Sequence, residues 1–357
     1  MGIKVSIRGY WVQTFMYATL LLASLLVGGC SQPLEFHISK ISGPTMGTEY
    51  HVSWVSKTGD HAASELEKKS IKQQIDQRLS NINKSMSTYD LQSELSLINH
   101  SFNPNWQNIS VGLYRVLVMA KQVNEQSDGA FDITVGPLVN LWGFGPNKAN
   151  DLVPELSEIN GLLAEVGSDA ISLREQGGIF QLRLAAPRYL DLSAIAKGYA
   201  VDRLGNLLQE RGVDNYLVEV GGEIVAKGFK PQNKHWRIAI EAPDDDGRSV
   251  QIIIPLLNMG LATSGDYRNF FELDGKRFSH TIDGRTGYPV DHNLASVSVL
   301  HESVALADAW ATALTVLGVE RGLELAEIYG LAAYFIVRSD KGYQQLSSHQ
   351  FKILRLD

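Results

Sequence analysis

The chain has 357 residues, of which 44% are apolar and 20% charged, a composition typical of a globular protein with one large core or two modest ones. Its formal net charge of −7 argues against a general affinity for nucleic acid, and it makes a metal ion the natural partner of any bound pyrophosphate. Cys30 is the single cysteine, which excludes a disulfide within the chain and a site of several thiolates.

The N-terminal segment has the parts of a secretory signal. Lys4 and Arg8 precede a mostly apolar run over 11–27, and small residues stand directly before Cys30. The ending Val-Gly-Gly-Cys resembles the bacterial lipobox, in which cleavage leaves a lipid-modified cysteine as the first residue. A transmembrane helix is the alternative, although a run of about 17 residues is at the lower limit for spanning a bilayer.

This segment defines the expected organisation of the chain. We expect a lipoprotein signal peptide over 1–29, a lipidated tether over 30–40 that begins with acylated Cys30, and one folded region over 41–357. Acylation of Cys30 would leave the mature protein without a thiol, and therefore without a cysteine nucleophile.

Apolar periodicity predicts the first elements of the folded region. Alternating residues over 48–56 predict a half-buried strand, and residues at helical spacing predict helices over 64–84 and from Ser110 to near Gly129. The side chains that we expect these helices to bury are Ile71, Ile75, Leu79, Ile82, Leu113, Val116, Leu117, Ala120 and Val123.

The remaining elements follow a Gly/Pro/Asn-rich bend over 142–150 and a short helix. Further helices are predicted over 193–212 and 303–317. Predicted strands lie over 170–173, 178–185, 217–226, 235–241, 250–256, 295–300 and 331–338. Helices mixed with strand pairs of antiparallel character favour the α+β class over a doubly wound sheet.

A candidate metal site lies in the predicted helix over 303–317. Asp308 and Thr312 are four residues apart and therefore share one helix face. A carboxylate and a hydroxyl are hard oxygen ligands that suit Mg²⁺ holding substrate phosphates. The alternative is structural: an acid near the helix start that favours the dipole, and a threonine bonded back to a carbonyl.

Two further segments carry residues suited to an anionic substrate. Asp191 and Lys197 flank a predicted strand-to-helix junction, where free backbone groups and a cation can meet an anion; a capped helix start with a solvated lysine is the alternative. His280 lies in a polar, turn-rich segment, and a neutral imidazole there could accept a proton from a hydroxyl. A lone histidine is more often an ordinary surface or core residue, which is the alternative.

The usual nucleotide cradles are absent from the sequence. It contains neither a Gly-x-Gly-x-x-Gly turn after a strand nor a Walker A loop. Gly221 and Gly222 lie within the predicted strand over 217–226, where they indicate a bulge or a backbone approached by a ligand.

These segments together resemble the ApbE-type FAD:protein FMN transferases over nearly all of the chain that follows Cys30. The order and spacing of the motifs make the resemblance specific. The motifs are GPTMGT (43–48), MSTYD (86–90), DGAFDITVGP (128–137), LWGFG (141–145), DLSAIAKG (191–198), TSGDYR (263–268), SHTIDGRTG (279–287) and ADAWATAL (307–314).

The resemblance implies a role for each matching position, and a fold of two mixed α+β subdomains with the FAD and Mg²⁺ site in the cleft between them. His280 matches the catalytic base. Asp308 and Thr312 would bind Mg²⁺ together with the backbone carbonyl of Ala194. The residues that would line the FAD site are Met46, Tyr89, Ala130, Phe131, Asp132, Asp191, Lys197 and Ile282.

The resemblance also implies a reaction: Mg²⁺-dependent transfer of FMN from FAD to a threonine or serine hydroxyl of another protein, with release of AMP. The implied acceptors are flavoprotein subunits of sodium-pumping NADH:quinone reductases and Rnf-type complexes. The implied location is the periplasmic face of the bacterial inner membrane, with the outer membrane as the alternative. The competing functions are an FAD pyrophosphatase, in which water replaces the protein hydroxyl, and a flavin-binding lipoprotein without catalysis.

Two positions depart from the pattern of the family. Gly284 stands where proline is common, which could loosen the turn after Asp283. Ala311 stands where some members carry a second acid between the metal-binding aspartate and threonine, so any ligand from that position is missing here.

Overall fold

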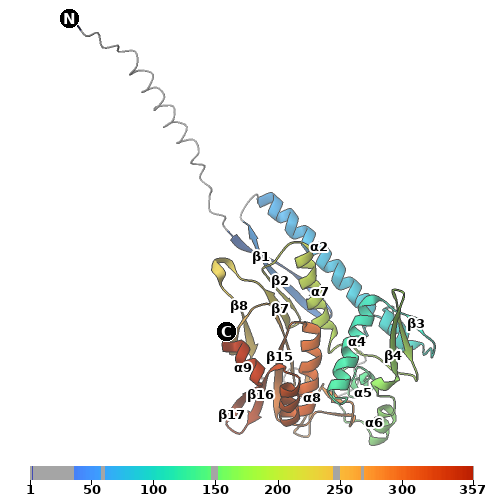
Figure 1. The fold of residues 1–357 in the computed structure, drawn as a ribbon. Coiled ribbons are helices and arrows are strands. Elements are labelled where there is room, and N and C mark those ends of the chain that lie inside the picture. The colour runs from blue at the N-terminus through green and yellow to red at the C-terminus, as the bar shows by residue number, and fades with distance from the viewer. Residues whose placement is uncertain are drawn as a thin grey trace. The chain divides into compact units, whose positions relative to one another are not determined.

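The computed structural model describes Gly2 and residues 36–57, 61–145, 152–243, 250–266 and 269–356. The predicted signal peptide beyond Gly2, Cys30 and the first part of the predicted tether lie outside the described residues. His37–Asp357 form one compact unit (Figure 1). Within the described ranges, no helix combines the length and the apolar character needed to cross a membrane.

An eight-stranded sheet forms the centre of this unit. Every neighbouring pair from β2 to β17 is antiparallel, as expected for the α+β class. In sheet order the strands are β1 (Phe36–Thr45), β2 (Thr48–Lys57), β6 (Tyr216–Val220), β7 (Glu223–Lys227), β10 (Met259–Gly265), β15 (Leu294–His301), β16 (Ala332–Ser339) and β17 (Gly342–Ser347).

Helices cover one face of this sheet and form the main core with it. Alternate residues of β6, Tyr216 and Val218, join this core, because successive strand residues point to opposite faces. The helices that contribute to the same core are α2 (His61–Met86), α3 (Glu94–His100), α4 (Val111–Gln126), α7 (Ala196–Glu210) and α8 (Val304–Ile328).

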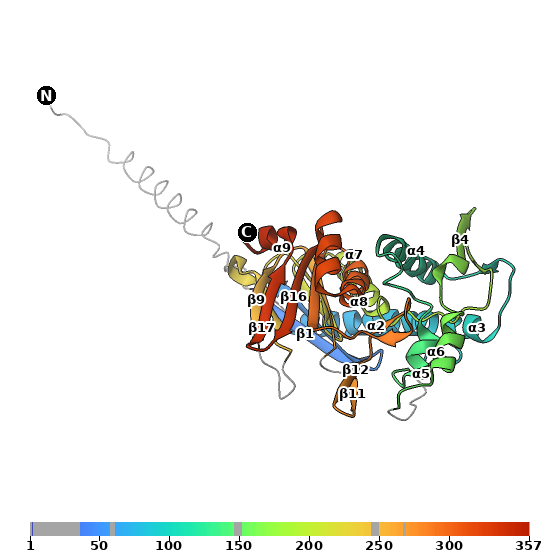
Figure 2. The same ribbon diagram turned by 90° about the horizontal axis from the view of Figure 1, so that it is seen from below.

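A hairpin and a short helix cover the opposite face. Leu217 of β6 and Leu261 of β10 pack there against a second core. Figure 2 shows α7 and α8 on one side of the sheet and β9 on the other. The covering elements are β8 (Trp236–Glu241), β9 (Val250–Leu256) and α9 (His349–Leu356).

The remaining elements are β3 (Gln107–Asn108), α5 (Gly136–Leu141), α6 (Leu156–Leu163), β4 (Ile171–Gln176), β5 (Ile179–Leu184), β11 (Phe270–Leu273), β12 (Lys276–Ser279), β13 (Ile282–Asp283) and β14 (Tyr288–Pro289). Residues of α5, α6, β11, β12 and β13 form a third core that includes Leu138, Trp142 and Phe278, whereas Leu182 and Leu184 of β5 belong to the main core. In Figure 2, α3, α5, α6 and β4 lie together, away from the eight-stranded sheet. The mixed α/β character agrees with the prediction, and His37–Asp357 form one compact unit, so the division into two subdomains stays a prediction.

Several predictions of elements are confirmed. The nine side chains expected to be buried by the first two helices are all buried in α2 and α4. Ser110 is the N-cap of α4, where its hydroxyl accepts the backbone N–H of Leu113.

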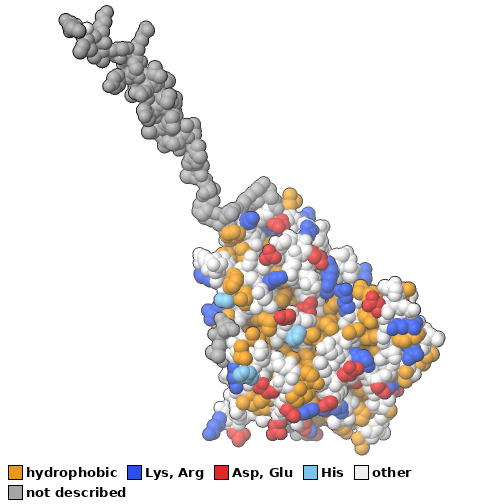
Figure 3. All heavy atoms as spheres, viewed as in Figure 1, with side chains coloured by type: hydrophobic (Ala, Val, Ile, Leu, Met, Phe, Trp, Pro, Cys, Tyr) orange, Lys and Arg blue, Asp and Glu red, His pale blue; other side chains and the backbone are white. Residues whose placement is uncertain are grey.

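On the face shown in Figure 3, basic and acidic side chains are interspersed and form no extended basic patch.

The single strand predicted over 217–226 is wrong: it is the hairpin of β6 and β7. Gly221 and Gly222 form its two-residue turn, with φ of 60° and 106°. Only glycine adopts these angles without strain, which is why a Gly-Gly pair between apolar alternations indicates a hairpin and not a bulge.

Two other boundaries also differ. Residues 36–40, predicted as tether, belong to β1. The sequence does not reveal this strand, because its charged and polar residues at the sheet edge lack the apolar alternation by which a strand is recognised. The helix predicted over 303–317 continues as α8 to Ile328 across a break at Gly318, whose φ of 73° departs from helical geometry.

The close packing of α7 on α8 gives a prediction of stability. A Cβ on Gly198 would come within 2.3–2.8 Å of backbone atoms of Val304 and Ala305. We expect Gly198→Ala to lower the free energy of unfolding by about 2 kcal/mol, because neither backbone can move without disturbing its helix. Gly161→Ala, in α6 with open space around it, is the control and should be neutral or stabilising. Urea denaturation measures both, and equal effects would contradict the argument.

Candidate active site

A cavity of about 780 Å³, a size suited to a dinucleotide, is lined by residues from the eight-stranded sheet, its helices and the neighbouring loops. Its wall combines the loop before α5, the start of α7, the tip of the β6–β7 hairpin, the strands β8 and β10, and the first half of α8. The predicted flavin, metal and base residues that line it are Tyr89, Ala130, Phe131, Asp132, Asp191, Ala194, Lys197, His280, Ile282, Asp308 and Thr312.

Met46 is the one predicted site residue among the described residues that does not line the cavity. It lies in the turn between β1 and β2 with φ of 48°, half-buried against the main core. The next strand residue, Thr48, lies beside Gly221 of the cavity wall, where an added Cβ would be 2.8 Å from the Thr48 Cγ2. The turn of Met46 therefore supports the wall from behind.

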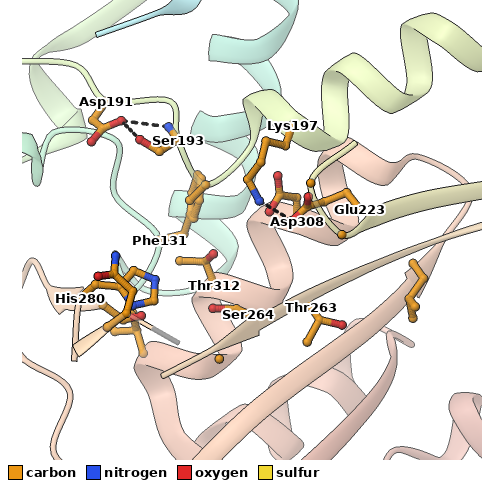
Figure 4. A pocket seen from close by; sticks show the side chains of 18 of the residues that line it. Phe131, Asp191, Ser193, Lys197, Glu223, Thr263, Ser264, His280, Asp308 and Thr312 are labelled. Carbon is orange, nitrogen blue, oxygen red and sulfur yellow. Dashed lines mark hydrogen bonds and ion pairs between the residues drawn. The ribbon is translucent and has the colours of Figure 1, made fainter. Parts of the chain in front are cut away.

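A lysine and two acids form the charged part of the wall. The Lys197 ammonium of α7 makes an ion pair with Oε1 of Glu223, the first residue of β7 (Figure 4). Asp308 of α8 completes the group, and its Oδ2 accepts the backbone N–H of Gly198 at 3.1 Å. The predicted alternative of a solvated Lys197 is therefore wrong.

The charges of this group depend on burial. Burial lowers the pKa of Lys197, but the Glu223 and Asp308 carboxylates outweigh this effect and raise it above its ordinary value. Burial raises the pKa of Glu223 to about 7 and also raises that of Asp308. With both acids ionised the group carries one net negative charge, which favours a cation in the cavity.

Glu223 was not identified from the sequence. It is 2% exposed, and its Oε2 is buried without a hydrogen-bond partner. The only signal in the sequence was an acid at an inward-facing position directly after Gly221 and Gly222. A strand read through these glycines conceals that signal, because it shows neither the turn nor the face on which Glu223 lies.

The oxygen donors expected for a metal fit a magnesium ion. Asp308, Thr312 and Ala194 line the same cavity, and the Thr312 hydroxyl has no hydrogen-bond partner in the described part of the chain. It is Thr315 that bonds back to a helix carbonyl, that of Ala311, at 2.8 Å. Where residues are described, no three His, Cys, Asp or Glu side chains form a metal cluster. One carboxylate with neutral oxygens and substrate phosphates is the ligand set typical of Mg²⁺.

The departures from the family pattern lie near this site. Ala311 is fully buried and is not part of the cavity wall, so a side chain at this position faces the core in this chain. Gly284 packs tightly, since an added Cβ would lie 2.7 Å from a Cγ of Val135. The turn after Asp283 is held by its own hydrogen bonds, in which the Asp283 carbonyl accepts the Gly287 N–H at 2.8 Å.

The surroundings of His280 favour a neutral imidazole. Its Nδ1 lies 3.0 Å from the carbonyl oxygen of Asn269, so Nδ1 carries the proton and Nε2 is left as acceptor. Burial lowers the pKa of His280 below its ordinary value. The ring of Phe144 meets the imidazole edge-on at 6.3 Å between ring centroids, which fixes its orientation.

Two aspartates shape the loops of the wall. The Asp132 carboxylate accepts hydrogen bonds from the Thr134 hydroxyl at 2.6 Å and the Ser168 hydroxyl at 2.8 Å, so protein donors occupy it. Asp191 accepts the backbone N–H of Ser193 at 2.9 Å, and its own N–H donates to the carbonyl of Ile133 at 2.7 Å. These bonds connect the loop before α5 with the loop before α7.

The aromatic residues offer different surfaces. Tyr89 is 71% exposed and stands at the rim of the cavity, whereas Phe131 is 2% exposed and forms part of its wall. Exposed aromatic area next to an open cavity is suited to stacking against a flat ring.

The charge group gives a prediction of stability. Lys197→Met leaves Glu223 and Asp308 buried without a positive partner, so we expect the free energy of unfolding at pH 8 to fall by about 3 kcal/mol or more. Lys121→Met removes only an exposed pair with Glu125 and should cost less than about 0.5 kcal/mol. Urea denaturation compares the two variants, and similar losses would show that the buried pair has no special weight.

Comparison with known proteins agrees with this geometry. The model of the ApbE family matches residues 46–335. The FAD:protein FMN transferase of Haemophilus influenzae is 43% identical over 334 residues, which cover 93% of this chain and 95% of that protein. The corresponding protein of Vibrio cholerae is 42% identical over 333 residues, with coverage of 93% and 96%.

Solved structures give the same result. The flavin transferase ApbE from Vibrio cholerae superimposes with a TM-score of 0.80 at 41% identity, over 89% of this chain and 99% of that chain. The apo form of the Pseudomonas stutzeri flavinyl transferase ApbE gives a TM-score of 0.81 at 38% identity, over 91% and 98%. The resemblance predicted from the sequence is confirmed, and the chain belongs to the ApbE family.

Proposed function

We propose that this chain transfers the FMN half of FAD to a threonine or serine hydroxyl of another protein, with Mg²⁺ bound to the pyrophosphate. The observation that carries the proposal is one cavity that contains oxygen donors for a cation, an ammonium paired with a buried carboxylate, and an imidazole. Relatives named FAD:protein FMN transferase match this chain over most of their length, which supports the same activity.

The substrate fits the cavity by size and by charge. FAD is a dinucleotide with two flat ring systems and a negatively charged pyrophosphate. The exposed face of Tyr89 and the wall at Phe131 offer apolar contact for a ring. Lys197 supplies the positive charge for a phosphate, and the ion pair with Glu223 holds its ammonium at the wall.

Asp308, Thr312 and the carbonyl of Ala194 are the ligands that we propose for Mg²⁺. A Mg²⁺ ion held there would neutralise the negative charge that builds on the leaving phosphate. The hydrogen bond from Gly198 to Oδ2 fixes the rotamer of Asp308, so this carboxylate is positioned before any ligand arrives.

His280 acts on the incoming hydroxyl. Its Nε2 accepts the proton of the acceptor threonine or serine while the hydroxyl oxygen forms a bond to the phosphorus on the FMN side. The bond from that phosphorus to the bridging oxygen breaks in line, and AMP leaves with the bridging oxygen. The product carries FMN through a phosphoester bond.

Two other activities use parts of the same site. In an FAD pyrophosphatase, water takes the place of the acceptor hydroxyl, and AMP release does not depend on an acceptor protein. A flavin-binding protein without catalysis would need the aromatic and Lys197 contacts but not His280. The half-buried imidazole, oriented by its hydrogen bond to Asn269 and with a lowered pKa, favours a reaction over simple storage.

We further propose the cellular setting from the sequence. Cys30 after Val-Gly-Gly supports a lipid anchor on the periplasmic face of the inner membrane. Few residues separate Cys30 from Phe36 in the sequence, so a lipid on Cys30 would leave only a short tether before β1. Acceptors at that surface would be subunits of membrane redox complexes of the NADH:quinone reductase and Rnf types.

The metal assignment is tested with Asp308→Asn. This substitution keeps the shape of the side chain and removes its charge, so we expect Mg²⁺ affinity to fall and the rate of FMN transfer to decrease at least about 100-fold. Titration calorimetry measures Mg²⁺ binding, and intact mass of an acceptor domain measures transfer. Ala311→Ser, on the same helix but away from the cavity, should retain both. Undiminished Mg²⁺ binding by Asp308→Asn would refute the assignment.

The base is tested by the pH dependence of transfer. The neutral imidazole is the active form, and burial lowers its pKa, so kcat at saturating FAD and Mg²⁺, where titration of Glu223 affects binding least, should be constant at neutral pH and fall only below about pH 6.5. His280→Gln should lose about 10²- to 10⁴-fold in kcat and also lose this low-pH limb. His51→Gln, on the exposed side of β2, is the control. A His280→Gln enzyme with full transfer activity would exclude the role.

A further inference from the structure

The cavity extends beyond the phosphate-binding residues into a trough along β8. Five consecutive residues of this strand, Arg237 to Glu241, line it, and no residue of β9 does. The opposite wall is formed by Leu217, Glu219 and Ile224, on the sheet face that lies away from Lys197. The trough therefore borders β8 on the side that is turned away from its partner strand.

The register of the β8–β9 hairpin shows which backbone groups point into the trough. Arg237 lies opposite Pro255, and proline has no N–H to donate, so this pair is not mutually hydrogen-bonded. Hydrogen-bonded pairs alternate with such pairs, and Ile238 with Ile254 is therefore a bonded pair. The N–H and C=O groups of Arg237 and Ala239 consequently point away from β9.

These groups form an open strand edge. Among the described residues, neither Arg237 nor Ala239 has a backbone hydrogen-bond partner outside the hairpin, and β8 has β9 as its single neighbouring strand. Backbone donors and acceptors spaced along an open edge are complementary to another extended chain. An open edge inside a cavity is protected from edge-to-edge association and yet available to a segment that enters the cavity.

We propose that the open edge of β8 binds an extended segment of the acceptor protein by strand addition. This inference rests on the proposed transfer of FMN to a protein hydroxyl. The segment would pair with the backbone of Arg237 and Ala239, and its inward side chains would contact Leu217 and Ile224.

The position of the trough supports this occupant over another. The cavity continues along β10, where Leu261, Thr263, Ser264 and Gly265 all line it, and from there to His280. Residues 261–265 span about 13 Å, the length of about four residues of extended chain. A segment held on β8 would have to continue along β10 by about this length to bring a hydroxyl to His280, so the proposal requires only one short extended stretch of the acceptor.

The test removes one edge N–H. Ala239→Pro deletes a donor that points into the trough while it leaves the hydrogen bonds between β8 and β9 in place. We expect kcat/KM for the acceptor protein to fall at least about 10-fold, with unchanged affinity for FAD and unchanged AMP release in the absence of acceptor. Transfer is followed by intact mass at several acceptor concentrations.

The chain offers a matched control directly across the ladder. Ile253 is opposite Ala239, so its N–H also points away from the hairpin, but on the side away from the cavity, and its side chain is 48% exposed. Ile253→Pro should therefore transfer like the wild type. Ala239→Ser keeps the N–H and should do the same, which separates the donor from the side chain. Equal kinetics of the two proline variants would overturn the proposal.

A measurement on the wild type guards against misfolding of Ala239→Pro. Residue-resolved hydrogen exchange with saturating acceptor should slow exchange at Arg237 and Ala239, whereas saturating FAD alone should not. Protection by FAD alone would assign the trough to the flavin and overturn the proposal. If the wild type transfers no FMN to any acceptor, the proposed function itself fails; if it transfers and β8 amides exchange as before, only the strand addition fails.

Discussion

The hydrogen bond between the Gly198 N–H and Asp308 Oδ2 is the contact on which the site depends. It joins the first turn of α7 to α8 at 3.1 Å and satisfies one of the free N–H groups at the helix start. The same turn of α7 carries Lys197, and the preceding loop carries Ala194. Because Gly198 has no side chain, the two helices approach closely enough for one aspartate to serve as both a helix contact and a wall of the cavity.

The charge group around Lys197 is costly to bury, which favours a ligand site in this wall. Two buried carboxylates face one ammonium, and Glu223 Oε2 has no hydrogen-bond partner. Burial of unsatisfied charge costs free energy, and folded proteins retain it chiefly where a ligand or a reaction uses it. A divalent cation and a pyrophosphate would add opposite charges of similar size, so the site could fill without leaving a large excess of either sign.

The sequence predicted much of this arrangement because long amphipathic elements and motif spacing are local signals. The inward faces of α2 and α4, and the cavity positions of His280 and Asp308, follow from such signals. Glu223 was missed because its importance arises from a hairpin turn that brings it against Lys197. The open edge of β8 was also inaccessible, because pairing partners and the residues that cover a strand are set by tertiary structure and not by alternation along the chain.

The β6–β7 hairpin would allow one cavity to serve the two partners that we propose. Val220 and Glu223, the pair next to the turn, face the helices. Glu219 and Ile224, the next pair away from the turn, face β8. The sheet ends at the Gly-Gly turn, so the cavity continues around this tip from one face to the other. Because successive strand residues face opposite sides of the sheet, the dinucleotide would lie on the helix side of the hairpin tip in our proposal. The acceptor segment would lie on the β8 side. The acceptor can then approach the phosphorus without displacing the nucleotide, as in-line attack on one bound substrate by another requires.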